Sequence, residues 1–289
     1  MGKNIVIVGL GLIGGSLAMA LKGFEDYKVT GVVRRQATAD YALAHGVCDE
    51  VTRDTREALR RADVTVLCID PKDIVWFLEE YRDDFKPGSL VTDVCGIKGA
   101  VMEAAEVLPE SVDFIGGHPM AGTEFSGIEN ALPDLFRSAH YIITPRRTSR
   151  RAHIALLERM AMHIGCKDVV NTTPEKHDAI IAYTSQMMHI IAVSVCDDES
   201  LFACQGFEGS SFRGCTRVAD LDVDLWTQLF SMNKGALTDA LDRLAENLNA
   251  YRTALRSGDV EGLRHKLTWS AGRKHRMNLG ERSTDPYYV

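Results

Sequence analysis

The sequence predicts an α/β fold, in which a doubly wound parallel sheet is followed by an all-α C-terminal domain. Short apolar runs alternate with helical patterns up to Thr172, as in chains of βαβ units. A glycine-rich turn directly follows the first apolar run and opens the first helix. After Thr172 the pattern becomes almost entirely helical. These three observations predict the fold class.

Each expected element has a local signal. Short apolar runs bounded by glycine, proline or polar residues are typical of buried strands. They lie at 4–8, 27–33, 64–69, 90–94, 114–116, 141–144 and 167–170. Helical spacing predicts helices at 16–22, 37–45, 55–61, 74–81 and 98–107, and one between 144 and 167.

The second domain begins with a helix-start signal. Thr173-Pro174-Glu175 combines a hydroxyl cap, a proline at the first position and an acid in the first turn. We therefore expect a dinucleotide-binding domain over 1–172 and a helical substrate-binding and dimerisation domain over 173–289. The tail from Gly280 is expected to be loosely held.

A leucine-rich seam follows alternating steps of four and three residues, at Leu237, Leu241, Leu244, Leu248, Tyr251 and Leu255. Such a seam packs within its domain or forms a dimer interface between long helices. We expect a homodimer.

Composition narrows the class of protein. The 289 residues carry a net charge of −7, which disfavours nucleic acid as a partner. The seven cysteines include no C-x-x-C pair, so we expect no metal site and a reducing, cytoplasmic location. We expect no membrane association, because no stretch approaches the roughly 20 apolar residues of a membrane span.

The glycine-rich turn Gly9-Leu10-Gly11-Leu12-Ile13-Gly14 has the G-x-G-x-x-G spacing of a Rossmann-type domain. The first glycine permits the tight turn, the second lets the backbone approach a pyrophosphate, and the third lets helix and strand pack closely. The pyrophosphate is then expected at the helix N-terminus. Asp70 and Gly96 are also expected to contact the cofactor.

The end of the second strand indicates which cofactor is used. NAD usually requires an acid there for the ribose 2′-hydroxyl, but this chain has Val33 followed by Arg34 and Arg35. Guanidinium groups bind phosphate in a bidentate manner. NADP or NAD is therefore expected, with NADP favoured; alternatively, the two arginines are simply solvated.

A second glycine-rich segment follows the strand at 114–116. It reads Gly116-Gly117-His118-Pro119-Met120-Ala121-Gly122-Thr123-Glu124 and presents His118 on a constrained turn. Ligands of doubly wound sheets bind at the carboxyl ends of the strands. Since histidine removes protons efficiently near neutral pH, we expect His118 to be the catalytic base in an alcohol oxidation.

The chain resembles the prephenate/arogenate dehydrogenase family of tyrosine biosynthesis. The resemblance rests on G-L-G-L-I-G-G-S from Gly9, H-P-M-A-G-T-E from His118, T-S-Q-M-M-H from Thr184 and S-F-R-G-C-T-R-V-A from Ser211. It implies oxidation of the ring hydroxyl of prephenate, with loss of carbon dioxide to give 4-hydroxyphenylpyruvate. Arogenate, which would give tyrosine directly, is the alternative substrate.

The resemblance also implies roles in the second domain. His189 is implied as a second active-site histidine, and Ser185 shares its helix face at a spacing of four. Gln186 stands where the family usually has histidine. From the residues alone, His189 is equally a hydrogen-bonded core histidine.

Arginines are natural receptors for a substrate with two carboxylates. Arg217 matches the family's substrate-binding arginine, Arg213 matches a basic position, and Trp226 matches an aromatic one. Gly96 replaces a serine that the family uses to orient its catalytic histidine. Arg213 and Trp226 alternatively belong to the surface and the core.

Two other readings compete with this one. A β-hydroxyacid or imine dehydrogenase usually has a lysine early in the second domain, and Lys176 is near that place. A dinucleotide-sensing regulator would need neither His118 nor Arg217.

The length predicts no added regulatory domain, so any feedback by tyrosine is expected to act at the active site.

Overall fold

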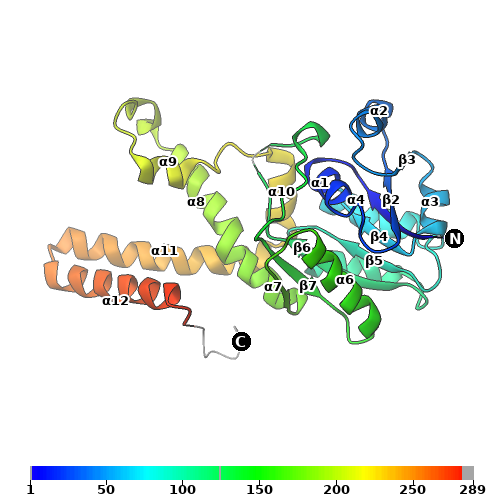
Figure 1. The fold of residues 1–289 in the computed structure, drawn as a ribbon. Helices are drawn as coiled ribbons and strands as arrows, with labels where there is room; N and C mark the ends of the chain where they lie inside the picture. The colour runs from blue at the N-terminus through cyan, green and yellow to red at the C-terminus, as the bar shows by residue number, and fades with distance from the viewer. Residues whose placement is uncertain (1, 124, 282–289) are drawn as a thin grey trace.

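A computed structural model describes residues 2–123 and 125–281 of the chain (Figure 1). Its eight strands form one sheet in the order β3-β2-β1-β4-β5-β6-β7-β8. The strands are β1 Lys3–Val8, β2 Tyr27–Val32, β3 Glu50–Thr52, β4 Val64–Leu67, β5 Leu90–Asp93, β6 Asp113–Pro119, β7 His140–Thr144 and β8 Asp168–Asn171. The expected fold class is confirmed.

One pairing differs from an all-parallel sheet, because β6 and β7 run antiparallel, with His118 opposite Ile142. Between them the described chain contains only the short 3₁₀ helix η2 (Ile128–Asn130) and no crossover helix. Antiparallel neighbours need no such crossover. The pairing extends β6 to Pro119, so His118 lies on a strand and not on the turn expected from its glycine-rich surroundings.

Alternate residues of β1 enter the two cores that cover the sheet. Ile5 and Ile7 pack with α1, α2 and α6, whereas Val6 and Val8 pack with α3, α4 and α5. These helices are α1 Leu12–Ala20, α2 Gln36–Ala44, α3 Thr55–Arg61, α4 Pro71–Glu80, α5 Gly99–Ala104 and α6 Arg151–His163. Helices on both faces explain why the central strands are almost wholly apolar.

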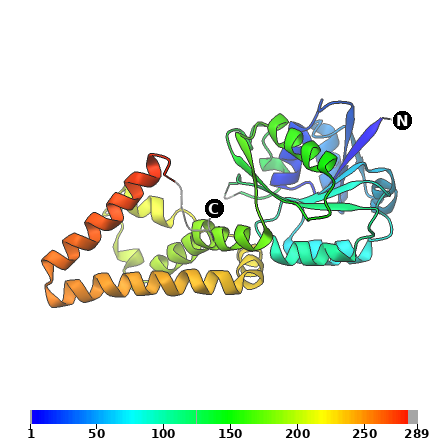
Figure 2. The same cartoon turned by 90° about the horizontal axis from the view of Figure 1, so that it is seen from below.

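The rest of the described chain, up to residue 281, is mainly helical. It contains α7 Pro174–Ile181, the π-helix η3 Ala182–Gln186, α8 Met187–Cys196, η4 Glu199–Ala203, α9 Ser210–Thr216, α10 Val223–Met232, α11 Lys234–Ser257 and α12 Val260–Asn278. Helices α11 and α12 form a hairpin that projects away from the sheet (Figure 2). Gly258, in the left-handed region at φ 68°, ends α11.

The leucine-rich seam is buried at one end of α11 and exposed at the other. Leu237 is 5% exposed, and Leu241 and Leu244 pack beside it. Leu248 and Leu255 are 58% and 66% exposed. Only the first part of the seam therefore packs within the described chain.

The helical run Pro174–Cys196 corrects the expectation about apolar stretches. By length and composition it could cross a membrane, with a mean hydropathy of 1.5 over its most apolar window. Its His177, Asp178 and Gln186 nevertheless form hydrogen bonds to other elements. One such run is weak evidence for a membrane span, and 28% of its most apolar window is buried within the described chain.

Smaller differences concern element ends. The three-residue edge strand β3 was not predicted, and α1 begins at Leu12 rather than Ser16. The expected loose tail falls mostly on residues 282–289, outside the described residues, as does Glu124 of the second glycine-rich segment.

Candidate active site

The glycine-rich turn has the backbone that its sequence predicts. Gly9 has φ +91°, and a Cβ there would lie 2.4 Å from the carbonyl oxygen of Cys68. A Cβ on Gly14 would lie 1.9 Å from the carbonyl oxygen of Gly9, so α1 packs directly on the turn. A Cβ on Gly11 would meet nothing within 4 Å. Gly11 thus faces open space at the N-terminus of α1, where an anion is stabilised.

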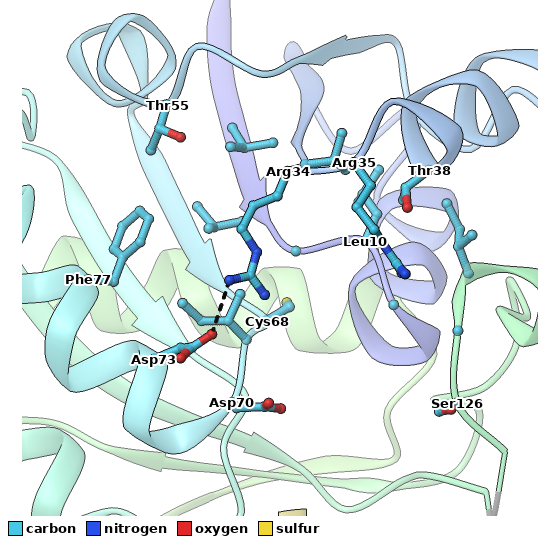
Figure 3. A pocket seen from close by; sticks show the side chains of 18 of the residues that line it. Leu10, Arg34, Arg35, Thr38, Thr55, Cys68, Asp70, Asp73, Phe77 and Ser126 are labelled. Atoms are coloured by element: carbon cyan, nitrogen blue, oxygen red, sulfur yellow. Dashed lines mark ion pairs between the residues drawn. The ribbon is translucent and has the colours of Figure 1, made fainter.

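A pocket of about 980 Å³ opens beside this turn, at the carboxyl ends of β1, β2 and β4. That volume is at the upper end of the usual range for ligand sites. Among the expected cofactor contacts, Gly9, Gly11, Arg34, Arg35 and Asp70 line it (Figure 3). The open glycine turn, a helix N-terminus and two arginines fit a dinucleotide.

The other expected cofactor residues do not line this pocket. Leu12, Ile13 and Gly14 form the first turn of α1 behind it. Gly96 lies outside the pocket, where a Cβ would be 3.9 Å from Nε2 of His118.

His118 forms one end of a buried chain of three side chains, which we call the histidine chain. Its Nδ1 lies 2.9 Å from Nε2 of His177, and Nδ1 of His177 lies 2.7 Å from Oδ1 of Asp178. A carboxylate only accepts, so His177 donates from Nδ1 and accepts at Nε2. His118 therefore donates from Nδ1, and its Nε2 keeps a lone pair, as a general base requires.

Both histidines are held in the neutral state. Burial lowers the pKa of His118 well below its ordinary value, and the neighbouring His177 and the charge of Lys98 lower it further. Burial also lowers the pKa of His177, against the opposing hydrogen bond to Asp178. A neutral His118 can accept a proton at physiological pH.

Asp178 joins the two domains through the same carboxylate. Its Oδ1 accepts the backbone N–H of Lys98 and its Oδ2 that of Gly99, both at 2.7 Å, at the N-terminus of α5. A carboxylate there is favoured by the unpaired N–H groups and the helix dipole. Asp178 thus fixes α7 against the sheet domain.

A buried ion pair supports the strand that carries His118. The fully buried Lys98 ammonium contacts the carboxylate of Asp93, which also accepts the N–H groups of Cys95 and Gly117. Gly117 directly precedes His118. Since removing one partner of such a pair leaves an uncompensated buried charge, the pair holds this part of β6 firmly.

The second expected histidine lies in the helical domain. His189 donates from Nδ1 to the carbonyl oxygen of Ser185 at 3.0 Å and stacks on Trp226, with ring centroids 3.6 Å apart. Burial lowers the pKa of His189, the Ser185 bond opposes this, and the charge of Arg217 lowers it further. The structure therefore stacks His189 on Trp226, and the charge of Arg217 acts on the same imidazole.

Helix α10 connects this cluster to His118. Trp226 and Leu229 are one helical turn apart and share a face. Leu229 is also 3.6 Å from the Cβ position of Gly96, which borders His118. The two expected histidines thus lie along the same face of α10.

Two expected substrate residues are placed differently. Gln186 is 1% exposed; its Nε2 donates to the carbonyl oxygen of Leu229, and its Oε1 accepts from Asn233. Its amide therefore serves packing within the helical domain. Arg213 is exposed and donates from Nη1 to the carbonyl oxygen of Glu208, which leaves its other guanidinium N–H groups available.

Sequence reasoning did not identify His177, Asp178, Asp93 or Lys98. Adjacent histidine and aspartate in the first turns of a helix, directly after the last strand, were the available signal for the first two. Asp93-x-x-x-x-Lys98 at the end of a strand is too common a pattern to single out.

A Rossmann-type sheet whose carboxyl edge carries a glycine-turn pocket, and which meets a helical domain through a histidine at that edge, is typical of two-domain dehydrogenases that use a nicotinamide dinucleotide. The family description "Prephenate dehydrogenase, nucleotide-binding domain" matches residues 17–170, and "Prephenate dehydrogenase, dimerization domain" matches residues 173–268. The chain belongs to the prephenate dehydrogenase family, as its motifs predicted.

Individual relatives agree over nearly the whole chain. The cyclohexadienyl dehydrogenase of Zymomonas mobilis is 31% identical over 90% of this chain and 91% of its own. Synechocystis arogenate dehydrogenase is 30% identical, with a TM-score of 0.82 over 95% of this chain and 99% of its own. Prephenate dehydrogenase from A. aeolicus, solved with hydroxyphenyl propionate and NAD+, is 25% identical, with a TM-score of 0.85 over 96% and 99%.

Proposed function

We propose that this protein is a prephenate dehydrogenase that oxidises prephenate to 4-hydroxyphenylpyruvate with release of carbon dioxide. The observation that carries the proposal is the histidine chain, which leaves Nε2 of His118 as a neutral acceptor at the carboxyl edge of the sheet. Arogenate is the second candidate substrate, because it carries the same ring hydroxyl and relatives named for both activities are similar to this chain.

In the proposed reaction the ring hydroxyl loses a proton and its carbon loses a hydride. Nε2 of His118 takes the proton, and His177 and Asp178 hold the imidazole in the required tautomer. When bound, the nicotinamide supplies the hydride acceptor. Cleavage of the bond to the ring carboxylate releases carbon dioxide, and its electrons complete the aromatic ring. The ring oxygen takes back a proton from Nε2 of His118 and becomes the hydroxyl of the product.

Substrate carboxylates are received in the helical domain. Arg217, whose charge acts on His189, offers a guanidinium for charge-assisted hydrogen bonds. Stacking on Trp226 fixes the ring of His189, with Ser185 as its backbone acceptor. Arg213 is a second basic group one turn before Arg217, and Gln186 contributes by holding α8 in place.

NADP is the preferred cofactor in this proposal. Arg34 and Arg35 line the pocket next to Val33, which stands where an acid would select NAD.

The lysine expected of a β-hydroxyacid or imine dehydrogenase is not the group that reaches His118, because the contact from α7 comes from His177.

The proposed division is a dinucleotide-binding domain over 1–172 and a substrate and dimerisation domain over 173–289, acting as a homodimer in the cytoplasm. Leu248, Leu255, Leu267 and Trp269 on the α11–α12 hairpin are each more than half exposed, as interface side chains are in an isolated protomer. The seven cysteines are all free, which suits a reducing compartment. Light scattering of wild type and Trp269→Glu tests the dimer.

The test of function is the rate of reduced cofactor formation at 340 nm with prephenate or arogenate, each with NADP or NAD. Turnover is expected, and His118→Ala is expected to lower kcat by about 10²- to 10⁴-fold. His140→Ala, an exposed histidine on β7, is the control and keeps activity. A folded protein that turns over neither substrate, or a His118→Ala variant with full activity, would refute the proposal.

A further inference from the structure

The strongest unassigned feature is an ion pair across the dinucleotide pocket. Nη1 of Arg34, just after β2, lies 3.6 Å from Oδ2 of Asp73, in the first turn of α4, and both residues line the pocket (Figure 3). The Arg34 side chain is 89% exposed and that of Asp73 42%. A solvated pair of this kind is weak, so a bound anion can compete for the arginine.

The two arginines of this segment are therefore not equivalent. Within residues 2–123 and 125–281, Arg35 makes no ion pair, whereas Arg34 is held by Asp73. The backbone here is anchored, because Arg53 donates from Nε to the carbonyl oxygen of Arg34 and from Nη1 to Oε1 of Gln36. Arg34 thus changes partner by side-chain rotation alone.

The side of the pocket that faces Arg34 is negatively charged. Asp70, at the N-cap of α4, also lines the pocket. Its pKa is raised by burial and further by the charge of Asp73, which shows that the two carboxylates lie within electrostatic range. An added phosphate dianion near Arg34 meets this negative charge, whereas an uncharged ribose hydroxyl does not.

We propose that Asp73 sets the choice between NAD and NADP by competing with the 2′-phosphate for Arg34 and by repelling it. The inference rests on the proposed function, which assigns this pocket to a nicotinamide dinucleotide. With Asp73 in place, Arg34 is neutralised when NAD is bound and must be released when NADP binds. Asp73 is a specificity-determining residue, because it limits the preference for NADP over NAD that Arg34 and Arg35 would otherwise produce.

The experiment measures binding without turnover, by isothermal titration of ADP-ribose and of 2′-phospho-ADP-ribose. Asp73→Asn is expected to strengthen binding of the phosphorylated ligand relative to the other on the order of tenfold, and less at high salt. When Arg34→Gln is combined with Asp73→Asn, the gain in relative affinity for 2′-phospho-ADP-ribose is expected to disappear. Asp83→Asn, which removes an exposed charge from the loop after α4, outside the pocket, is the matched control.

The outcomes separate the two proposals. A ratio of affinities that Asp73→Asn changes less than twofold, or that Asp83→Asn changes equally, overturns the role of Asp73. Failure of both ligands to bind the wild-type protein also overturns it, because the pocket is then not a dinucleotide site. Normal binding with the expected ratio, in a protein that turns over neither substrate, refutes only the proposed reaction.

Discussion

Nε2 of His177 lies 2.9 Å from Nδ1 of His118, so the expected base in the sheet domain is oriented by a side chain of the helical domain. Because Asp178 accepts from the far side of His177, the order of donors and acceptors is determined along the whole histidine chain.

The first prediction concerns the pH dependence of catalysis. The base must be neutral, and the pKa of His118 lies well below its ordinary value because of burial and the adjacent His177 and Lys98. We expect kcat/KM to be level from about pH 6.5 upward and to fall only at more acid pH. Asp178→Asn removes the anionic acceptor and is expected to lower kcat about 10- to 100-fold, with little change in cofactor affinity.

A pH profile of kcat/KM for both proteins checks this. An acid limb centred at or above pH 7 in the wild-type protein would contradict the lowered pKa of His118. An Asp178→Asn variant with unchanged kcat and an unchanged profile would contradict the tautomer assignment.

The second prediction concerns stability against pH. Burial lowers the pKa of His177 in the folded state, so the unfolded chain binds a proton first as the pH falls. The contribution of neutral His177 to the free energy of unfolding is therefore fully present above the pKa of histidine in the unfolded chain, about 6.5. This contribution is lost as the pH falls below that value. One such group gives a slope of at most about 1.4 kcal/mol per pH unit.

Urea unfolding between pH 5 and 8 measures this slope. His177→Gln is expected to lower stability at neutral pH and to reduce the loss on acidification. Met187→Ala, a buried change on the following helix without a titrating group, should lower stability while keeping the wild-type slope. Equal slopes in wild type and His177→Gln would count against a neutral, buried His177.

A third prediction separates two glycines of the same turn. Gly11→Ala meets no atom within 4 Å, so it is expected to fold normally and to weaken dinucleotide binding at least about tenfold, since its methyl enters the space a pyrophosphate needs. Gly14→Ala would place a methyl 1.9 Å from the carbonyl oxygen of Gly9 and is expected to cost about 1–3 kcal/mol of stability or more. Thermal melts with and without NADP distinguish the two; a Gly11→Ala protein with wild-type affinity would refute the assignment of the turn.

A fourth prediction uses the glycines that flank His118. Serine fits at Gly96, where the added Cβ is 3.6 Å or more from its neighbours, and its hydroxyl comes near Nε2 of His118. We expect the Gly96→Ser protein to keep the wild-type melting temperature within a few degrees. Gly117→Ser has no such room, because a Cβ there lies 2.6 Å from the carbonyl oxygen of Asp93, and it should melt far lower. Similar melts for both would contradict the packing described around β6.

Much of the fold was accessible from the sequence because it depends on local signals. The G-x-G-x-x-G spacing predicted a turn that the steric contacts of Gly9 and Gly14 now explain. Strand β3 was missed because three partly exposed residues at a sheet edge carry no apolar pattern. The length of β6 was missed because its last residues are held by an antiparallel partner strand, in which Gly117 pairs with Ile143, 26 residues further along the chain.

Local sequence signals also indicated some of the candidate site residues, but not the contacts between them. His118 and His189 stood out through their motifs, but the partner of His118 depends on a contact between domains that no local pattern encodes. Gln186 was expected at the substrate because it stands where the family usually has histidine. The π-helix η3 ends at Gln186 and is buried there, so its amide bonds to Leu229 and Asn233 instead.

The carboxylate of Asp178 caps α5 and also accepts a hydrogen bond from His177, so the two domains cannot be exchanged independently. In the proposed reaction neither half of the chain supplies a complete proton acceptor: the sheet domain supplies the imidazole of His118, and the helical domain supplies the groups that decide which of its nitrogens is basic. A helical domain grafted from another protein would have to bring its own histidine–aspartate pair in register with α5. Inheritance of this chemistry therefore requires both halves to be passed on together.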